Sequence, residues 1–581
     1  MEELKYTEIL RRNKELAASL KGPVYKVDVL SNIITSQFNE VFEYNLRSEG
    51  INAKVSSGDY DNILQDAIKC NDSDLIFIFW EAANLIDGLQ YKAGSMNEEE
   101  LETLISKTCS EIDFVLKSLE SRQLIIFNKF SSLIFNYGFI RKNNFDILCN
   151  RLNDFLLKKA SSNLLIIETD KIFAELSITK SVDFRFYYSS KALYTIDFYK
   201  AYTKFILPVI KSIKGKSKKA LVFDCDNTLW KGVIGEDGME NIEMSGKGKK
   251  GVFFEEIQHL AIELSKKGVI IGLCSKNNLK DVEGVFEKHP DISLKNEHII
   301  IKKINWDDKA SNIKKIAEEL NIGLDSIVFI DDSDFELEYV NDQLPEVKTL
   351  RVPPNLYEYS QLLRNNLSLF YSFSQSEEDL KRVDMYKQEV ERINEKASFK
   401  NIESYLSSLE LRIIIHVNPS IFIARISQLS QKTNQFNLTT KRYTERDIAK
   451  FIDAKDFLTV AFEVHDKFGD SGVTGVLILR TDLTSKTAEI DSFLMSCRVI
   501  GRNIEIAFFN FLIEYLEKLG MTMIYAKYSK TLKNEQVSDF YEKIGFICTE
   551  SSEKEKVYQL KLGDYIIKQI KYINIEYGTK N

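Results

Sequence analysis

The sequence predicts an α/β protein with about three domains. Short apolar runs of strand length alternate with helix-length segments in the N-terminal region and again after residue 219, which is typical of doubly wound parallel sheets. The 581 residues also exceed what a single hydrophobic core accommodates. With 44% hydrophobic and 28% charged residues, the composition is that of an ordinary folded protein.

Charge and hydropathy exclude several functional classes. The formal net charge of −8 argues against a general nucleic-acid-binding protein, which needs a basic face. The longest apolar run, residues 75–80, is too short to span a membrane, and residues 1–16 form a charged amphipathic segment rather than a signal peptide. We therefore expect a cytoplasmic protein with no nucleic-acid or membrane partner. The seven cysteines include no CxxC pair, so neither disulfides nor a structural zinc site is indicated.

The first domain is predicted over residues 1–210. Its expected elements are strands at 25–30, 53–56 and 75–79 and a helix at 38–49 that ends at Gly50. The turns Leu30-Ser31-Asn32 and Gly58-Asp59 resemble those of a degenerate SGNH hydrolase. A serine nucleophile needs a histidine base, and no histidine precedes His259. We therefore expect a catalytically silent domain in which Ser31 is a strand-end turn residue.

A linker is predicted at the basic stretch 211–219, and a second domain follows it over residues 217–365. Its first strand, 220–223, ends in Asp224 and Asp226, followed by Thr228. From this stretch alone, an acidic turn and a metal-dependent phosphate site are both reasonable interpretations. In a parallel sheet, ligands bind beyond the carboxyl ends of the strands, which places these carboxylates where chemistry is expected.

Three further strand candidates in this domain run into polar residues. Helices are expected between them at 253–266 and 310–320. The strands and the residues that follow them are 269–273 with Ser275, 299–301 before Lys309, and 327–330 with Asp331 and Asp332.

This ordered set resembles the four motifs of the haloacid dehalogenase (HAD) superfamily. The resemblance implies that Asp224 is a nucleophile forming an aspartyl-phosphate and that Asp226 is the general acid and base. It also implies that Ser275 and Lys309 contact the phosphoryl group, with Thr228 as a further substrate-binding residue.

The same resemblance implies Mg²⁺ as cofactor, because a carboxylate attacking phosphorus needs a cation to offset the repulsion between two anions. The implied metal ligands are Asp224, Asp226 and Asp331. For Asp332, a second metal-binding carboxylate and a plain turn residue both remain open.

The spacing of the motifs predicts an uncapped HAD domain. Thr228 precedes Ser275 by 47 positions and Ser275 precedes Lys309 by 34, which leaves no room for a large inserted cap. Phosphoryl transfer is helped by the exclusion of bulk water, so we expect the lid to come from another domain of the chain or from a carrier protein.

A connecting helix over 366–400 and a third domain over 401–560 follow, with 561–581 as a C-terminal tail. The charged segment from Glu377 is interpreted as a solvated helix. The amide-rich run 431–437, which contains Lys432 and Asn434, fits either a solvated loop or a hydrogen-bonding site for a polar substrate.

Residues 488–505 resemble the acyl-CoA-binding turn of the GNAT acetyltransferase fold, with a strand at 488–495, a turn at 496–505 and a long helix to Lys518. The segment from Asn534 to Phe546 resembles a later part of that fold. Asn503 departs from the pattern, which has Gly or Ala at this position. A larger side chain there obstructs the close approach of a phosphate to the backbone. Phosphopantetheine on a carrier protein is the alternative ligand to CoA.

Cys497 is the candidate acyl-accepting thiol. Arg498 and Arg502 would favour its thiolate and bind a phosphorylated acyl chain if their side chains converge. An ordinary buried cysteine is the competing interpretation. Cys225 is a weaker candidate because it flanks the HAD nucleophile and should pack inward.

The domain order resembles the FkbH-like (HAD-IIIC) family over nearly the full chain. The most specific stretches are 223–238, 431–443 and 496–505. The resemblance implies removal of phosphate from 1,3-bisphosphoglycerate and loading of the glyceryl unit as a thioester on an acyl carrier protein, as in secondary metabolism. The alternatives are a phosphatase or acyltransferase for another substrate, such as a surface-polysaccharide precursor, and a non-enzymatic carrier-docking scaffold.

Overall fold

The computed structural model describes residues 4–70, 72–135, 142–161, 163–247, 250–372, 382–396, 399, 401–531 and 533–578. The chain divides into two compact units, Met1–Ile210 and Lys211–Asn581. Within the described ranges, no helix combines the length and the apolar character needed to cross a bilayer. The α/β fold class predicted from the sequence is confirmed by one parallel sheet in the first unit and two further sheets in the second.

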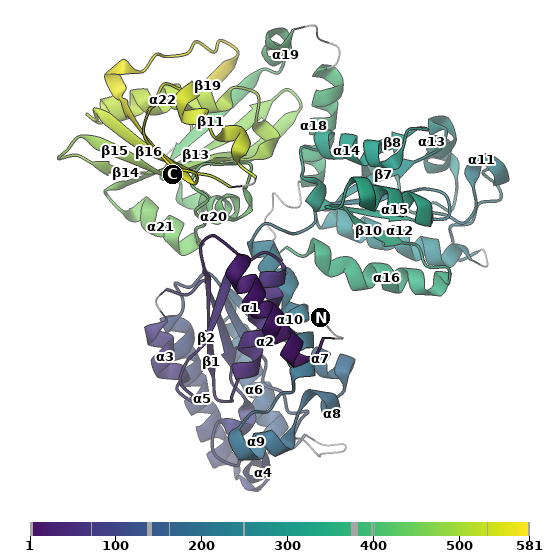
Figure 1. Cartoon of the computed structure of the whole chain (residues 1–581), viewed down its shortest axis with the longest axis vertical. Coiled ribbons are helices and arrows are strands. Elements are labelled where there is room, and N and C mark those ends of the chain that lie inside the picture. The colour runs from purple at the N-terminus through teal and green to yellow at the C-terminus, as the bar shows by residue number, and fades with distance from the viewer. Residues whose placement is uncertain are drawn as a thin grey trace. The chain divides into compact units, whose positions relative to one another are not determined.

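The first unit is a doubly wound domain with helices on both sides of its sheet (Figure 1). All five strands are parallel, in the order β2-β1-β3-β4-β5. The strands are β1 (Tyr25–Ser31), β2 (Ala53–Ser57), β3 (Leu75–Phe79), β4 (Ile125–Asn128) and β5 (Leu164–Ile167). The helices are α1 (Tyr6–Ser19), α2 (Ser36–Ser48), α3 (Ile63–Lys69), α4 (Leu89–Lys92), α5 (Glu98–Ser118), α6 (Asn144–Lys158), α7 (Thr169–Leu176), α8 (Ile178–Ser181), α9 (Phe184–Ser190) and α10 (Ile196–Ile213).

Ser31 ends β1 and is 7% exposed, and its hydroxyl donates a 2.6 Å hydrogen bond to the carbonyl oxygen of Ile33. Asn32, which follows, exchanges hydrogen bonds with the backbone of Glu81. The serine is therefore tied to the backbone at a strand end, where the sequence predicts a turn residue.

The second unit begins with a second parallel sheet, in the order β10-β9-β6-β7-β8. Its strands are β6 (Ala220–Phe223), β7 (Ile270–Ser275), β8 (Ile299–Ile304), β9 (Ile327–Asp331) and β10 (Lys348–Arg351). Its helices are α11 (Ile234–Asp237), α12 (Gly251–Lys266), α13 (Leu279–Lys288), α14 (Lys309–Glu319), α15 (Asp334–Gln343) and α16 (Tyr359–Asn366). Leu221 and Phe223 pack into one core while Ala220 and Val222 pack into the other, because successive strand residues face opposite sides.

The intervals between the predicted motifs are short in the structure as well. Among the described residues, α11 and α12 lie between Thr228 and β7, and α13 and β8 lie between Ser275 and Lys309. Neither interval contains a separate cap domain.

The third sheet is mixed and lies in the same unit. Its path is β17-β18-β16-β15-β14-β13-β11-β19, and β12 pairs with β15. Its strands are β11 (Leu411–Val417), β12 (Phe436–Asn437), β13 (Phe457–Asp466), β14 (Gly469–Asp482), β15 (Thr487–Met495), β16 (Met523–Ser529), β17 (Ile547–Ser551), β18 (Glu555–Lys561) and β19 (Ile573–Tyr577). Its helices, with the preceding α18 (Arg382–Lys396), are α19 (Ile402–Ser408), α20 (Ile423–Lys432), α21 (Glu445–Asp453), α22 (Ile504–Lys518) and α23 (Phe540–Lys543).

Three expectations about this region need correction. The predicted tail contains β19, which pairs in parallel with β11 and therefore belongs to the sheet. The predicted solvated helix is packed along its described part: α18 buries Tyr386, and Arg392 is 2% exposed. Of the two interpretations of the amide-rich run 431–437, the solvated loop does not fit, because α20 extends to Lys432 and Asn437 is a buried residue of β12.

Candidate active site

The carboxyl edge of the second sheet brings Asp224 and Asp331 together. Phe223 of β6 pairs with Ile330 of β9, so the next residue of each strand lies at the same level of the sheet. The backbone N–H of Asp224 donates a 2.9 Å hydrogen bond to the carbonyl oxygen of Ile330, which extends the ladder to the site itself. Asp332 follows directly, and one carboxylate oxygen from each of the three aspartates lies within 4.8 Å of the others.

Lys309 completes this group, which we call the carboxylate centre (Asp224, Lys309, Asp331 and Asp332). It is the first residue of α14, whose N-cap is Asp308. Its Nζ lies 3.1 Å from Oδ1 of Asp224 and 2.5 Å from Oδ2 of Asp331. Burial alone would lower the pKa of this ammonium group, but Asp224 and Asp331 more than offset that effect and raise it.

Burial dominates the electrostatics of the carboxylates. Burial raises the pKa of Asp224 to about 6, with Lys309 opposing the shift and Asp331 adding to it. Burial likewise raises the pKa of Asp331 and of Asp332. Three carboxylates therefore share one lysine in a largely desolvated space, which leaves an excess of negative charge. Their hard oxygen atoms form a donor set that fits a divalent cation such as Mg²⁺.

The side chain of Asp226 lies outside this group, and its role as a metal ligand stays a prediction. Its Oδ1 accepts hydrogen bonds from Nε1 of Trp230 (2.9 Å) and from the backbone N–H of Ile234 (3.1 Å). Its Oδ2 accepts from Nδ2 of Asn277 at 3.0 Å. These donors hold the carboxylate in one orientation, which suits a proton-transfer group better than a ligand.

Asn277 is a site residue that sequence reasoning missed. Its Nδ2 also lies 3.1 Å from Oγ of Ser275, so it joins Asp226 to Ser275. Ser275 ends β7 and is 1% exposed. The signal was present, since Asn277 belongs to the polar run that follows the strand. Thr228 is fully buried, and its Oγ1 has no hydrogen-bond partner among the described residues.

A cavity of about 500 Å³ opens beside the carboxylate centre. Asp332 and Asn227 line it on the side of the centre, and Lys231 and Arg351 supply positive charge. Further lining residues include Phe253, Phe254, Pro353, Pro354 and Tyr357. The cavity is larger than a phosphate group needs, and it combines cationic with apolar surface.

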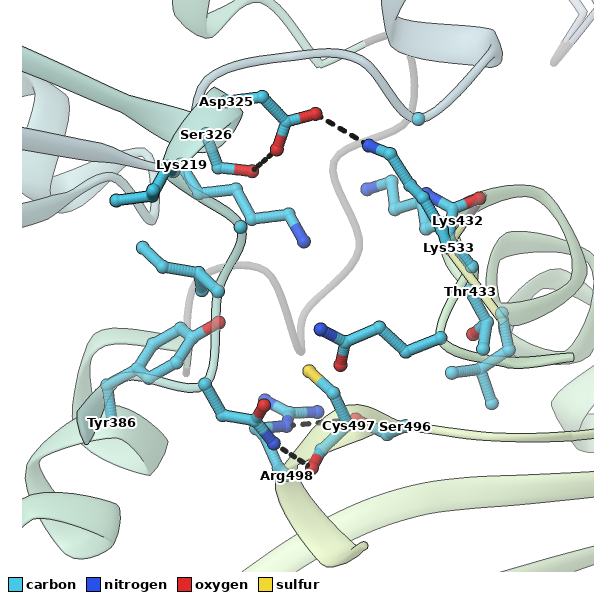
Figure 2. A pocket seen from close by; sticks show the side chains of 18 of the residues that line it. Lys219, Asp325, Ser326, Tyr386, Lys432, Thr433, Ser496, Cys497, Arg498 and Lys533 are labelled. Atoms are coloured by element: carbon cyan, nitrogen blue, oxygen red, sulfur yellow. Dashed lines mark hydrogen bonds and ion pairs between the residues drawn. The ribbon is translucent and has the colours of Figure 1, made fainter. Parts of the chain in front are cut away.

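A second cavity, of about 650 Å³, contains the predicted thiol and is called the Cys497 cavity. Figure 2 shows the sulfur of Cys497 pointing into it, with Lys219 and Tyr386 on one side and Lys432 and Lys533 on another. The structure thus brings together four predicted site residues, which are Lys432, Asn434, Cys497 and Arg498.

The walls of the Cys497 cavity come from loops and helices around the second and third sheets. Nδ2 of Asn321 donates a 2.6 Å hydrogen bond to the carbonyl oxygen of Cys497. Nζ of Lys533 lies 2.6 Å from Oδ2 of Asp325 (Figure 2). The loop before β9 and the turn after β15 are therefore joined at this cavity.

The two arginines after Cys497 do not converge on its sulfur. Nη1 of Arg498 lies 2.7 Å from the sulfur of Met385 and its Nε donates to Oγ of Ser496. Arg502 is 5% exposed and does not line the cavity; its guanidinium contacts Asp466 (3.1 Å) and Glu389 (2.7 Å). The prediction that Arg498 and Arg502 act together on Cys497 is therefore corrected, because the carboxylates of Asp466 and Glu389 neutralise Arg502.

Asn503 occupies a left-handed backbone conformation, with φ 62°, at the N-cap of α22. Asparagine tolerates this conformation better than most residues. Its Nδ2 donates a 2.6 Å hydrogen bond to the hydroxyl of Tyr572. The side chain that departs from the acetyltransferase pattern is thus fastened to the segment before β19.

The two candidate sites lie at opposite edges of the second sheet. Lys219 immediately precedes β6 and lines the Cys497 cavity, whereas Asp224 immediately follows β6 in the carboxylate centre. At about 3.3 Å per residue, their Cα atoms are roughly 16 Å apart. A molecule of only a few carbon atoms cannot span this distance.

Comparison with solved structures finds similarity on the phosphatase side. The N-terminal part of the Bacteroides fragilis protein BF1531, which contains a phosphatase domain and is complexed with Mg, is 27% identical with a TM-score of 0.55, and the alignment covers 64% of this chain and 100% of that chain. The Vibrio cholerae spermidine/spermine N-acetyltransferase SpeG, in mutant form, is 16% identical with a TM-score of 0.22, covering 26% of this chain and 95% of that chain. No protein-family model and no curated protein matches the chain. Over the larger part of its length, the chain is therefore similar to a structure that contains a magnesium-bound phosphatase domain.

Proposed function

We propose that residues 217–365 form a Mg²⁺-dependent phosphatase centre of the HAD type. The observation that carries this proposal is the carboxylate centre: three aspartates and one lysine gathered at the carboxyl edge of a parallel sheet. The similarity to a phosphatase-containing structure complexed with Mg supports it.

The residues of the centre divide the chemistry between them. Asp224 attacks phosphorus and forms an aspartyl-phosphate as the bond to the leaving oxygen breaks, and Asp226 gives that oxygen its proton. Asp226 then takes a proton from water, which attacks phosphorus and releases inorganic phosphate and free Asp224. Lys309 and Ser275 stabilise the negative charge on the phosphoryl oxygens.

Asp224, Asp331 and Asp332 would hold the metal ion. When bound there, Mg²⁺ reduces the repulsion between the attacking carboxylate and the phosphate oxygens. Asp224 can attack only as a carboxylate, and burial raises its pKa to about 6.

We further propose that the chain transfers a glyceryl unit from 1,3-bisphosphoglycerate to an acyl carrier protein. Support comes from the sulfur of Cys497 in a cavity lined by Lys219, Lys432 and Lys533, a lining suited to a phosphorylated acyl group. The thiolate attacks the acyl carbon, the carbon–oxygen bond to phosphate breaks, and inorganic phosphate leaves. The phosphopantetheine thiol of the carrier then takes the acyl group and returns the Cys497 thiolate.

In this proposal the two sites carry out different steps. Thioester formation belongs to the Cys497 cavity, and hydrolysis of the remaining phosphate ester belongs to the carboxylate centre. Because roughly 16 Å separates Lys219 from Asp224 along β6, the phosphorylated acyl group must travel, and the flexible arm of a carrier protein supplies that movement.

The test is incubation of the full chain with 1,3-bisphosphoglycerate, Mg²⁺ and a phosphopantetheinylated carrier, followed by intact mass measurement. We expect a glyceryl adduct on the carrier and release of phosphate. Absence of an adduct with several carriers, while phosphate is still released from simple esters, would reject the transferase and retain the phosphatase.

The alternative is a phosphatase or acyltransferase for another substrate, such as a surface-polysaccharide precursor. The cavity of about 500 Å³ beside Asp332 favours a substrate larger than a phosphate group. A panel of phosphorylated metabolites and acyl donors distinguishes the two, because only the glyceryl proposal requires a carrier protein. Complete absence of Mg²⁺-dependent turnover would favour a carrier-docking scaffold.

A further inference from the structure

A second group of potential metal ligands lies in the third sheet, and none of its members lines either candidate site. We call it the histidine cluster: His416 on β11, Glu463 and His465 on β13, and Asp470 on β14. One ligand atom each of Glu463, His465 and Asp470 lies within 4.8 Å of the other two. His416 adjoins them, with its Nε2 3.0 Å from Oε1 of Glu463.

The strand register places these side chains on one face. Glu463 and His465 are two residues apart on β13, and the residue between them, Val464, is fully buried on the opposite face. Ile414 pairs with Glu463, so His416, two residues further along β11, shares that face. His465 pairs with Asp470 on β14, and register shifts flank Glu463, as is common where a strand re-aims a functional side chain.

The ring nitrogens of both histidines are buried without a satisfied hydrogen bond. Nε2 of His416 and Nε2 of His465 have no hydrogen-bond partner among the described residues. Both atoms nevertheless lie close to the carboxylate of Glu463, at 3.0 Å and 3.4 Å. The distances are short, but the angles are not those of N–H donation to the carboxylate, so these nitrogens are buried acceptor sites as much as donors. A buried nitrogen without a hydrogen bond destabilises the folded chain, and a ligand that binds the nitrogen would remove this cost.

Three members of the cluster are close enough to share one cation, because one ligand atom each of Glu463, His465 and Asp470 lies within 4.8 Å of the other two. The imidazole of His465 meets the two carboxylates through different nitrogens, with Nε2 3.4 Å from Glu463 and Nδ1 3.5 Å from Asp470. An ion bound between the carboxylates would take one of these nitrogens as its ligand. The carboxylate of Glu463 lies between the two imidazoles, with one oxygen near each.

Neighbouring groups hold the His416 ring in place. The Phe422 ring packs edge-on against it, with centroids 4.9 Å apart. Gly578 leaves no space on another side, because a Cβ atom there would lie 2.2 Å from Nδ1 of His416. The imidazole is therefore pre-positioned before any ligand binds.

We propose that the histidine cluster is a binding site for a transition-metal dication of the zinc type, distinct from the Mg²⁺ site of the phosphatase centre. Glu463, His465 and Asp470 provide three ligands, and His416 contacts the Glu463 carboxylate from the neighbouring strand. Imidazole nitrogen with carboxylate oxygen favours Zn²⁺, Co²⁺ or Ni²⁺, whereas Mg²⁺ prefers an all-oxygen set. The ion would join β13 and β14 and stabilise this part of the sheet.

The test uses the full chain, stripped with a chelator, desalted, and titrated with Co²⁺ in the presence of excess Mg²⁺ so that the carboxylate centre is occupied. We expect visible d–d absorption that saturates at one Co²⁺ per chain and is lost on addition of Zn²⁺. We also expect Zn²⁺ to raise the thermal unfolding midpoint of the stripped protein.

Variants locate the ion. His465→Gln and the milder Asp470→Asn, whose side chain is 57% exposed, should each weaken Co²⁺ binding at least tenfold. His259→Gln, which removes an exposed imidazole of α12, and Asp224→Asn should leave binding unchanged. No absorption in the wild-type chain, or equal absorption in the two cluster variants, would overturn the proposal. Circular dichroism establishes that each variant is folded, and Asp470→Asn alone suffices if a histidine variant is not.

Discussion

Lys219 and Asp224 lie at the two ends of the same short strand, β6: Lys219 lines the Cys497 cavity, and Asp224 belongs to the carboxylate centre. The second sheet therefore separates the two candidate sites, since one opens at its amino edge and the other at its carboxyl edge. If the chain is bifunctional, the two half-reactions have different residues and are separable by mutation.

The first prediction concerns this separation. Asp224→Asn should lower phosphate-ester hydrolysis by about a thousandfold or more, because it removes the nucleophile, yet leave acylation of the enzyme intact. Cys497→Ser should do the reverse. Intact mass measurement of the enzyme and a phosphate-release assay report the two activities separately, and loss of both activities in either variant would contradict the assignment. Cys548→Ser, at an exposed cysteine, is the matched control.

The second prediction concerns Lys309. Its removal leaves Asp224 and Asp331 buried without their cation, and breaking a buried ion pair typically costs about 3–5 kcal/mol. Lys309→Met should therefore lower the free energy of unfolding strongly in chelator, and Mg²⁺ should restore more of it than in the wild type. Denaturant unfolding with and without Mg²⁺ measures this.

Lys303→Met is the control, because Lys303 pairs with Glu319 in a partly exposed position and such pairs contribute about 1 kcal/mol or less. Equal destabilisation by the two variants would mean that Lys309 does not balance the carboxylates.

Most of the carboxylate centre was predictable, because the ends of parallel strands meet at one edge. Apolar runs located β6, β7 and β9, and the polar residues after them had to be neighbours. The details depend on turns instead: Asp226 points to Trp230 and Asn277 rather than to the other carboxylates, and no spacing rule determines the direction of a side chain in a turn.

The third sheet was harder to predict because its pairings are long-range. The strand β19 has an alternating apolar pattern, Ile573, Ile575 and Tyr577, but nothing local indicates that its partner is β11. The histidine cluster likewise depends on the antiparallel register of β11, β13 and β14, which joins residues far apart in sequence.

The third prediction is a pH dependence of stability in the first unit. Burial raises the pKa of Glu81 to about 7, although its hydrogen bond from the Tyr194 hydroxyl opposes the shift. The folded state thus binds the proton more tightly than the unfolded state, whose value is 4.5. The contribution of Glu81 to the free energy of unfolding is most favourable below pH 4.5 and is lost as the pH rises to about 7.

Glu81→Gln keeps an acceptor for Tyr194 and removes the ionisation. We expect the variant to be more stable than the wild type at pH 8, by up to about 3 kcal/mol, and close to it at pH 4.5. Thermal unfolding at the two pH values measures the effect. Glu175→Gln, at an exposed position of α7, controls for loss of a negative charge, and an identical response of the two variants would contradict the assignment.

The fourth prediction distinguishes the two arginines after Cys497. Asp466 has a fully buried side chain and accepts from Arg392 at 2.7 and 2.9 Å and from Arg502 at 3.1 Å. Arg502→Ala removes one of the two cations from this buried network, so it should destabilise the chain by about 3 kcal/mol or more. Its effect on the reactivity of Cys497 should be small.

Arg498→Ala should behave in the opposite way. Arg498 lines the Cys497 cavity and contacts Ser496 and Met385 rather than a carboxylate, so its loss removes positive charge near the thiol at little cost in stability. The expected result is a slower reaction of Cys497 with an anionic thiol reagent, measured against a neutral reagent of similar size. The ratio of the anionic-reagent rate to the neutral-reagent rate cancels general changes in access to the thiol. An unchanged ratio in Arg498→Ala would show that the wrong arginine had been assigned to the cavity. A lowered ratio in a folded Arg502→Ala would show the same.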